Sequence, residues 1–327
     1  MLNRELAVDG QKVETIAVLG TGNMGPGIAV LFARAGRDVN IWAHSQGGAR
    51  KALDDCRRIA DDLVTHGLLD SAASTVVLER VRVTRKLAQA VGAADFVSES
   101  VVEDLSIKRV LLGEVMDLCP AHAVVSSNTS TLLPSCLQAG LPRPECLLVA
   151  HFWNPAQLAP LVEVCAGGQT SPRVVASTME LLQAAGKKPV LMRKEILGFI
   201  GNRLMHAMNR EALSLIEAGV IDAEGIDQVV LASFGPRFAN LGPMEYLDSI
   251  GLDLIQKIQE YLYADLDATA GQMPIIERRC REHKLGAKTG RGLMDWSAKN
   301  GDDAARRRDA EFYRRSVRRR QQRVQNA

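Results

Sequence analysis

A glycine-rich turn near the start of the chain constrains the fold more than any other feature of the sequence. The β-rich run Thr15–Leu19 leads directly into Gly20-Thr21-Gly22-Asn23-Met24-Gly25, and a helix-like segment, Ile28–Ala35, follows. In this strand–turn–helix context, a GxGxxG sequence lets the backbone turn tightly and approach a pyrophosphate at the helix N-terminus. The sequence therefore predicts a dinucleotide-binding site that includes Gly20, Gly22, Asn23, Met24 and Gly25.

The residues after the second predicted strand bear on which dinucleotide binds. NAD sites generally place an Asp or Glu there to bind the adenine ribose hydroxyls, but Ala43 occupies this position. Neutral Ala43, followed by His44 and with Arg50 and Lys51 downstream, would neither hold a 2′-hydroxyl nor repel a 2′-phosphate. We therefore expect NAD or NADP as the cofactor, with His44 among the residues that bind it.

The alternation of elements predicts the fold class. From Thr15 to Val149, short β-rich runs alternate with helical patterns, which is typical of a parallel sheet covered by helices on both faces. A charged helical stretch, Arg50–Val77, is broken near Gly67 and indicates a helical hairpin inserted into the nucleotide fold. The expected strands are Thr15–Leu19, Asp38–Trp42, Val81–Thr84, Phe96–Ser100, Ala123–Ser126, Leu147–His151, Leu161–Cys165 and Pro189–Met192.

After Lys194 the pattern becomes mostly helical, with predicted helices over Phe199–Ala218, Ala223–Ala232 and Met244–Leu262. We expect an α/β fold with a Rossmann-type doubly wound sheet in residues 1–193, followed by an all-α C-terminal domain in residues 194–300 for substrate binding and dimerisation. Residues 301–327 form a basic tail, and such charge runs are usually solvated helix faces.

Composition excludes several classes of function. The chain has 327 residues, and its 40 Lys and Arg nearly cancel its 38 Asp and Glu, which removes any general electrostatic reason to expect nucleic-acid or membrane binding. No apolar stretch approaches the roughly 20 residues needed to span a bilayer. The six cysteines are scattered without CxxC spacing, as expected of reduced thiols in a cytoplasmic protein, and they predict no metal site. We expect a cytoplasmic protein whose partner is a small molecule.

A histidine and a glutamate form a candidate catalytic pair. His151 follows the apolar run Leu147–Ala150, at the carboxyl end of a predicted strand, where ligands of open α/β sheets bind and where a general base would be useful. Glu163 interrupts another apolar strand, and burying its carboxylate requires a partner. A nearby imidazole would satisfy the acid, and the acid would fix the tautomer of the imidazole and stabilise its protonated form. We therefore expect His151 and Glu163 to lie together, facing the cofactor.

Several motifs occur in order from about Thr15 to Trp296. They are Gly20–Gly25, Ala94–Glu103, Ser127–Ser130, His151–Pro155, Leu161–Val164, Gly198–Arg203, Leu241–Glu245 and Lys288–Gly292. Together these motifs resemble those of the 3-hydroxyacyl-CoA dehydrogenase family. The resemblance implies that His151 is the base and Glu163 its orienting acid.

The same resemblance implies further site residues. Ser130 would hydrogen-bond the reacting oxygen and Asn202 would hold the substrate near its carbonyl, while Glu103, Lys108 and Asn154 would lie along the nicotinamide ribose. Three of these roles have simpler alternatives, because Ser130 could cap a turn, Asn202 could cap a helix and Lys108 could be a solvated lysine.

The resemblance implies an enzyme that oxidises the 3-hydroxyl of an L-3-hydroxyacyl-CoA with NAD(P), and most motifs favour this substrate. A free hydroxy acid such as carnitine or gulonate is the first alternative. A CoA site needs positive charge for several phosphates, and the inserted hairpin does not clearly supply it. Arg237 could clamp the carboxylate of a free acid, or could be an ordinary surface arginine. A cofactor-binding protein without catalytic duty, like the lens crystallin of this family, is the second alternative. The inserted hairpin is not clearly basic, since it carries Asp54, Asp55, Asp61 and Asp62 against Arg57 and Arg58.

In relatives the helical domain commonly pairs two subunits, so the resemblance also implies a homodimer formed through the C-terminal domain. Apolar segments of that domain, such as Leu213–Ile216 and Leu252–Ile258, could supply the contact. The sequence does not distinguish these segments from ordinary core.

Overall fold

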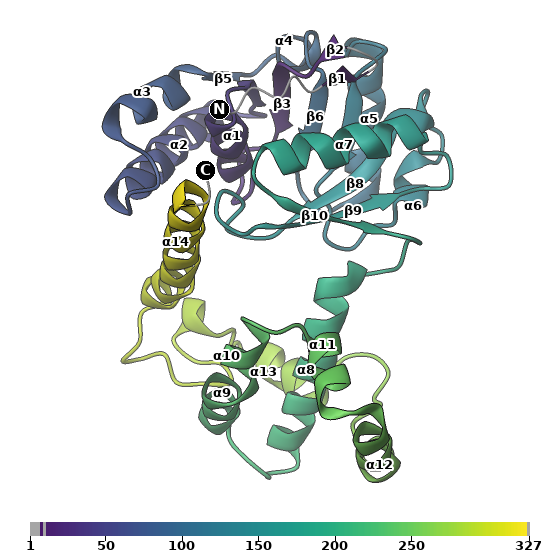
Figure 1. Cartoon of the computed structure of the whole chain (residues 1–327), viewed down its shortest axis with the longest axis vertical. Coiled ribbons are helices and arrows are strands. Elements are labelled where there is room, and N and C mark those ends of the chain that lie inside the picture. The colour runs from purple at the N-terminus through teal and green to yellow at the C-terminus, as the bar shows by residue number, and fades with distance from the viewer. Residues whose placement is uncertain (1–6, 9–10, 326–327) are drawn as a thin grey trace. The chain divides into compact units, whose positions relative to one another are not determined.

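The computed structural model describes residues 7–8 and 11–325, and the chain divides into two compact units (Figure 1). The first unit consists of Met1–Ile200 together with Arg308–Ala327, and the second of Gly201–Arg307. The first unit is therefore built from two segments of the chain, and the second unit lies between these segments in sequence.

The first unit is built on an eight-stranded sheet with the strand order β10-β9-β8-β7-β6-β3-β4-β5. A separate pair of short strands, β1 and β2, precedes it. Each predicted strand of the large sheet is present, with bounds that differ by at most one residue, so the Rossmann-type α/β fold is confirmed. The strands are β1 Ala7–Val8, β2 Gln11–Lys12, β3 Thr15–Leu19, β4 Asp38–Trp42, β5 Val81–Thr84, β6 Phe96–Glu99, β7 Val124–Ser127, β8 Leu147–Phe152, β9 Leu161–Ala166 and β10 Lys188–Met192.

The strands of this sheet are not all parallel. From β5 to β8 every neighbouring pair is parallel, as the alternating pattern predicts, whereas β9 runs antiparallel to β8. Only residues 153–160 connect these two strands, which is shorter than the roughly twelve residues that a parallel crossover needs. The short connection therefore forces the chain to turn back beside the strand that it has just left.

The helices of the first unit begin and end where local signals predict. The inserted hairpin is confirmed as two helices on either side of Gly67, which has a φ of +68°. Ser45 and Asp70 cap their N-termini, accepting hydrogen bonds from the backbone of Gly48 and Ala73. The helices are α1 Gly25–Arg34, α2 Gln46–Thr65, α3 Ser71–Glu79, α4 Leu87–Val91, α5 Leu105–Leu118, α6 Pro134–Gln138 and α7 Pro172–Ala184, with a 3₁₀ turn at Pro144–Cys146.

The basic tail forms a long helix, α14 (Gly301–Gln325), which belongs to the first unit from Arg308 onward. Tyr313 is buried, and its ring stacks on His66 at a centroid distance of 3.8 Å. Arg320 donates a hydrogen bond of 2.6 Å to the carbonyl of Gly67. The expectation of a solvated face is therefore wrong for one side of the helix, where Phe312, Tyr313 and Val317 recur at helical spacing and contact the core.

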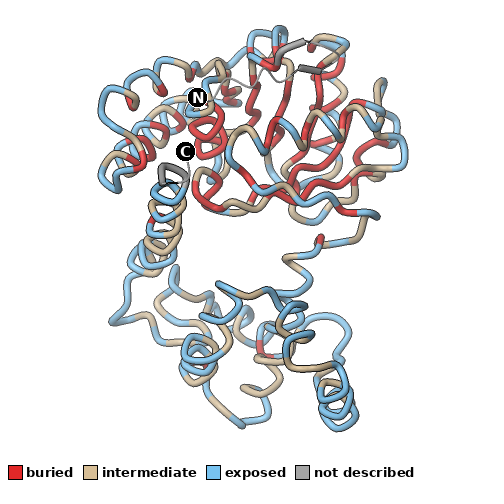
Figure 2. Tube along the Cα trace, viewed as in Figure 1, coloured by how far each residue is buried: buried red, intermediate tan, exposed pale blue. Residues whose placement is uncertain are grey.

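The second unit is helical, which confirms the predicted all-α part of the fold. Of residues 201–307, all of which the structure describes, only Ala223 and Ile275 are buried, whereas buried residues fill the strands of the first unit (Figure 2). Within the described part of the chain, no helix is long and apolar enough to cross a membrane. The helices are α8 Phe199–Glu217, α9 Ala223–Ala232, α10 Phe234–Phe238, α11 Pro243–Ile250, α12 Leu252–Leu262 and α13 Pro274–Arg281, with a 3₁₀ turn at Ala287–Thr289.

Lys187, just before β10, is a buried cation that makes stability depend on pH. Its ammonium donates hydrogen bonds to the carbonyls of Ala156 and Ala159, the latter at 2.7 Å. Burial, reinforced by the nearby charges of Arg34 and Arg319, lowers the pKa of Lys187 to about 7. Between that value and the pKa of an unfolded lysine, about 10.4, the unfolded chain binds a proton that the folded chain does not. Its contribution to the free energy of unfolding therefore rises with pH in this window, by up to about 1.4 kcal/mol per unit.

We expect Lys187→Met to reveal this contribution. Between pH 7 and 8.5 the free energy of unfolding of the parent should rise relative to that of the variant by about 1–2 kcal/mol, because only in the parent does folding release a proton from position 187, and the cost of this release falls as the pH rises. Urea unfolding at the two pH values measures the difference. Lys188→Met, at the exposed neighbouring lysine, is the matched control and should show no such rise. A difference between parent and Lys187→Met that stays flat with pH would contradict the assignment.

Candidate active site

The three glycines of the turn between β3 and α1 have different physical roles. Gly20 has a φ of +117°, and a Cβ there would lie 2.5 Å from the carbonyl oxygen of Ser100. A Cβ on Gly25 would lie 2.0 Å from the carbonyl oxygen of Gly20. A Cβ on Gly22, in contrast, would meet no atom of the protein within 4 Å. The first and third glycines are thus required by the protein's own packing, whereas Gly22 leaves open the space through which a pyrophosphate would approach the N-terminus of α1. The turn therefore fits a dinucleotide.

Two alanine substitutions separate these roles. We expect Gly22→Ala to change the free energy of unfolding by less than about 0.5 kcal/mol, because the methyl group meets no protein atom, yet to weaken NAD binding by about tenfold or more. Gly25→Ala should instead destabilise the fold by about 1–3 kcal/mol, because its methyl group collides with a backbone oxygen. Calorimetric titration with NAD and urea unfolding measure the two effects. Unchanged NAD affinity in Gly22→Ala would remove this glycine from the cofactor site.

The end of β4 has the neutral character that the sequence predicts. Ala43 is buried, and His44 is exposed with its ring edge-on to Trp42 at a centroid distance of 6.1 Å. Lys51 forms an ion pair with Asp55 along α2. Of the two cations downstream of Ala43, one is therefore already engaged within its own helix.

A buried ion pair joins the end of β6 to α5. The Lys108 ammonium lies 2.6 Å from a carboxylate oxygen of Glu99, and both residues are 0% exposed. The other oxygen of Glu99 accepts a hydrogen bond of 2.5 Å from the hydroxyl of Ser127. Lys108 also lies 3.4 Å from Glu103. The alternative of a solvated lysine is therefore wrong. A fully buried Lys108 can influence a bound cofactor only through its neighbours.

Glu103 holds the loop after β7. Its carboxylate accepts hydrogen bonds from the backbone of Ser130 (3.0 Å) and of Thr131 (3.2 Å) and from the hydroxyls of Thr129 and Thr131. Partial burial opposes ionisation, but these hydrogen bonds and the charge of Lys108 together lower the pKa of Glu103. The structure thus brings Lys108 and Ser130 together through direct contacts with Glu103. Thr129 and Thr131, for which the sequence predicted no role, also hold this carboxylate.

His151 and Glu163 lie directly opposite each other on the antiparallel strands β8 and β9. The Nδ1 atom of His151 is 2.9 Å from the Oε2 atom of Glu163, and the two residues are 7% and 2% exposed. The Oε1 atom of Glu163 accepts a hydrogen bond of 2.9 Å from the backbone of Ile200. Because an ionised carboxylate can only accept, Nδ1 carries the hydrogen, which leaves Nε2 as the nitrogen that can receive a proton.

Three residues that support this pair were not predicted as site residues. Trp153 donates an indole hydrogen bond of 3.1 Å to Glu163. Phe199 is fully buried with a φ of +51°, and its ring centroid lies 5.4 Å from that of His151. Asn128 accepts a hydrogen bond of 2.8 Å from the backbone at the end of β8. All three lie in the motifs that carry the family resemblance. Asn154, next to Trp153, is exposed in the connection between the two strands.

The strands that carry these groups are neighbours in the sheet (Figure 1). The glycine turn follows β3, Glu103 follows β6, Ser130 follows β7 and His151 lies near the end of β8, and these four strands are parallel neighbours. The strand order changes direction between β3 and β6, because β4 and β5 lie on one side and the later strands on the other. Ligands of open α/β sheets bind at such a point, beyond the carboxyl ends of the strands.

The remaining two predicted residues belong to the second unit. Asn202 is part of α8 and partly exposed. Arg237 is exposed in α10, with its guanidinium 4.5 Å from the centre of the Tyr246 ring. The structure therefore does not group Asn202 or Arg237 with His151 inside the first unit.

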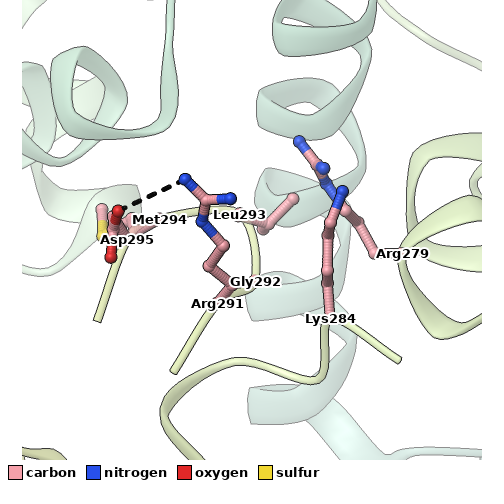
Figure 3. A pocket seen from close by; sticks show the side chains of 7 residues that line it. All are labelled: Arg279, Lys284, Arg291, Gly292, Leu293, Met294 and Asp295. Atoms are coloured by element: carbon pink, nitrogen blue, oxygen red, sulfur yellow. Dashed lines mark ion pairs between the residues drawn. The ribbon is translucent and has the colours of Figure 1, made fainter. Parts of the chain in front are cut away.

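A cavity of about 330 Å³ lies in the second unit and contains none of the predicted residues (Figure 3). Arg291 points across it toward Asp295, at 3.6 Å. In residues 7–8 and 11–325, no group of three or more His, Cys, Asp or Glu side chains is placed to hold a metal ion. The cavity is lined by Arg279, Lys284, Arg291, Gly292, Leu293, Met294 and Asp295.

Comparison with known proteins matches both parts of the chain to one family. The NAD binding domain of 3-hydroxyacyl-CoA dehydrogenase matches residues 15–196, and its C-terminal domain matches residues 198–296. The chain is 34% identical to 5-formyl-3-hydroxy-2-methylpyridine 4-carboxylate 5-dehydrogenase of Mesorhizobium japonicum over 285 residues, which are 86% of this chain and 90% of that protein. It is 32% identical to 3-hydroxybutyryl-CoA dehydrogenase of Clostridioides difficile over 288 residues, 86% of this chain and 99% of that protein.

A solved structure gives the same picture. The crystal structure of 5-formyl-3-hydroxy-2-methylpyridine 4-carboxylic acid 5-dehydrogenase, described as an NAD⁺-dependent dismutase, superimposes with a TM-score of 0.83 at 32% identity. The match covers 94% of this chain and 97% of that one. The likeness therefore extends over both units.

Proposed function

Because the chain belongs to the 3-hydroxyacyl-CoA dehydrogenase family and is thus an NAD-dependent oxidoreductase that acts on a CH–OH group, we propose that it oxidises a small free hydroxy acid with His151 as general base. The observation that carries the role of His151 as general base is its 2.9 Å contact with Glu163 at the carboxyl edge of the sheet. A base at that edge lies where the fold presents a bound cofactor and substrate to each other.

The chemistry of the pair follows from its hydrogen bonds. Glu163 holds the hydrogen of His151 on Nδ1, so Nε2 takes the proton of the substrate hydroxyl. The imidazolium that forms is stabilised by the carboxylate beside it. NAD, when bound, supplies the hydride acceptor for the substrate carbon. In the reverse direction His151 returns the proton to the carbonyl oxygen.

The other predicted residues complete the proposed site. The hydroxyl of Ser130, on the loop that Glu103 holds, and the amide of Asn202 would steady the charge that develops on the reacting oxygen. Glu103 and Asn154 would lie along the nicotinamide ribose. Lys108 would act only indirectly, by fixing Glu103 from its buried position.

The charge pattern of the inserted hairpin favours a free acid over a CoA thioester. Each contact joins a base to an acid of the same helix: Arg57 to Asp54 at 3.1 Å, Arg58 to Asp55 at 3.2 Å, and Lys51 to Asp55. The face therefore offers little uncompensated positive charge for the phosphates of CoA. Arg237, which is exposed, would be free to approach a substrate carboxylate while it remains stacked on its tyrosine. An L-3-hydroxyacyl-CoA remains the second candidate, because the chain spans 99% of a 3-hydroxybutyryl-CoA dehydrogenase.

A substrate panel tests this choice. Initial rates with NAD would be compared for 3-hydroxybutyrate, carnitine, gulonate and 3-hydroxybutyryl-CoA, and for 5-formyl-3-hydroxy-2-methylpyridine 4-carboxylate. We expect kcat/KM for one of the free acids to exceed that for the thioester by at least about tenfold, or about 1.4 kcal/mol. A higher value for the thioester would reverse the order of the two candidates. Binding of NAD without turnover of any compound would favour the non-catalytic, crystallin-like alternative.

We also propose that NADP is accepted beside NAD. Ala43 places no acid where it would repel a 2′-phosphate, and exposed Arg50 lies downstream. Because Lys51 is engaged with Asp55, the preference for NADP should be weak. Initial rates with both cofactors decide the point, and exclusive use of NAD would contradict it.

A homodimer through the second unit is the third part of the proposal. With only two buried residues, this unit has little core of its own, and apolar side chains such as Leu231, Met244 and Leu252 are more than 60% exposed. Exposed apolar surface on this scale is typical of a subunit interface. Analytical ultracentrifugation of the full chain should show a dimer, and a monomer at micromolar concentration would contradict the proposal.

A further inference from the structure

Trp153 shares a carboxylate oxygen with the histidine of the catalytic pair. Its indole Nε1 lies 3.1 Å from the Oε2 atom of Glu163, the same atom that lies 2.9 Å from Nδ1 of His151. Glu163 is almost completely buried, so its charge depends on such donors rather than on water. The indole is one of them, and unlike the imidazole it keeps the same charge at every pH of interest.

We propose that Trp153 is a positioning residue that sets how readily His151 takes up a proton, by donating a hydrogen bond to the same carboxylate oxygen that contacts the imidazole. A neutral donor stabilises the carboxylate whether or not the histidine is charged. It therefore reduces the additional stabilisation that the carboxylate gives to the imidazolium. When this donor is removed, the negative charge of Glu163 stabilises the imidazolium of His151 more strongly. The histidine then holds its proton to a higher pH.

Aromatic contacts fix the geometry that this effect requires. The ring centroid of Trp153 lies 5.7 Å from that of His151, at an interplanar angle of 53°, and Phe199 contacts the imidazole as well. The backbone of Ile200 occupies the other oxygen of Glu163. Because these contacts hold both rings and the carboxylate, the two donors reach the same oxygen together.

Other titratable groups near the pair do not duplicate the effect. Cys165 lies on the same strand as Glu163, and burial, with the charges of Glu195 and Glu163, raises the pKa of its thiol to about 12. It therefore stays neutral throughout the working range. The carboxylate of Glu195 accepts a hydrogen bond from the backbone of Ser135. On the other neighbouring strand, β10, the residue opposite Glu163 is the apolar Val190.

The test is Trp153→Phe, which keeps an aromatic ring and removes the N–H group. NMR of protein with labelled histidine, without cofactor or substrate, follows the titration of the His151 imidazole, whose signal is assigned by its loss in His151→Gln. We expect the midpoint to move up by about 0.5–1 pH unit. The acidic limb of the pH profile of kcat/KM for oxidation should move in the same direction, because this limb reports protonation of the base in the free enzyme.

Controls distinguish this effect of the N–H group from a change in packing. They also distinguish it from the proposed function, on which only the expected pH profile of kcat/KM rests. Trp296→Phe, in the second unit, should leave the midpoint unchanged. If Trp153→Phe does not fold, 3-benzothienylalanine at position 153 replaces the N–H by sulfur with nearly the same shape. An unchanged midpoint in a folded variant would overturn the inference. A shifted midpoint in a protein without turnover on any substrate would support it while rejecting the proposed enzyme.

Discussion

Replacing His151 by glutamine lowers turnover by about 10²–10⁴-fold, the usual contribution of a general base, while the dissociation constant of NAD stays within about threefold of the parent value. Turnover falls because the amide of glutamine cannot accept the hydroxyl proton. NAD binding is retained because the glycine turn follows a different strand from the one that carries position 151. Steady-state rates with the best substrate of the panel, combined with calorimetric titration of NAD, measure both quantities. The expected loss corresponds to about 3–5.5 kcal/mol of transition-state stabilisation.

His122 provides a matched control for this experiment. It also lies beside a carboxylate, with its Nε2 atom 3.0 Å from Asp95, but Asp95 precedes β6 and His122 precedes β7, so this pair lies at the amino edge of the sheet. We expect His122→Gln to leave turnover within about threefold of the parent. Near-normal turnover in His151→Gln, or an equal loss in His122→Gln, would end the assignment of His151 as the base.

Replacing Lys108 by methionine should destabilise the first unit by about 3–5 kcal/mol, a far larger effect than loss of a surface cation. Methionine fills a similar volume, but it leaves the carboxylate of Glu99 in a fully buried position without its cation. Glu103 loses a positive neighbour as well. Urea unfolding, followed by far-ultraviolet circular dichroism, measures the free energy of unfolding.

Two further variants show whether the cost comes from the unpaired charge. Lys108→Met combined with Glu99→Gln should recover much of the loss, because no uncompensated charge is then buried. Arg80→Met removes the cation from a partly exposed pair with Asp38, whose charged atoms are 3.0 Å apart, and should cost no more than about 1 kcal/mol. A cost in Lys108→Met that is as small as in Arg80→Met would contradict the burial of the pair.

The sequence predicts the sheet well because hydrophobic runs and glycine punctuation are local signals. The strands of the nucleotide fold fall within one residue of their expected positions, and the hairpin breaks at Gly67. The direction of β9 was not predicted, since the pattern of Leu161–Ala166 is the same in either orientation. Only the length of the connection 153–160 carries that information.

The candidate site is predictable where the residue type itself is unusual for its place. A carboxylate in an apolar strand pointed to Glu163 and to its histidine. Lys108 was placed in the site, but its burial was not foreseen, because its partner Glu99 lies on a different element. Trp153 was not identified as a site residue. Nothing in the sequence indicates that the N–H group of an aromatic residue after β8 donates to a buried carboxylate on β9. Long-range partners of this kind become visible only when the chain is folded.

The proposed acid–base pair occupies one short, continuous segment of the chain, because His151 and Glu163 face each other on adjacent strands joined by a short connection. Substitutions in the helical second unit, where we propose that part of the substrate site lies, can therefore accumulate while this segment stays unchanged. Its length is under strict constraint, since gain or loss of a single residue within β9 ahead of Glu163 would turn that side chain to the opposite side of the sheet. Homologous sequences should therefore differ in this segment by substitutions and rarely by insertions or deletions.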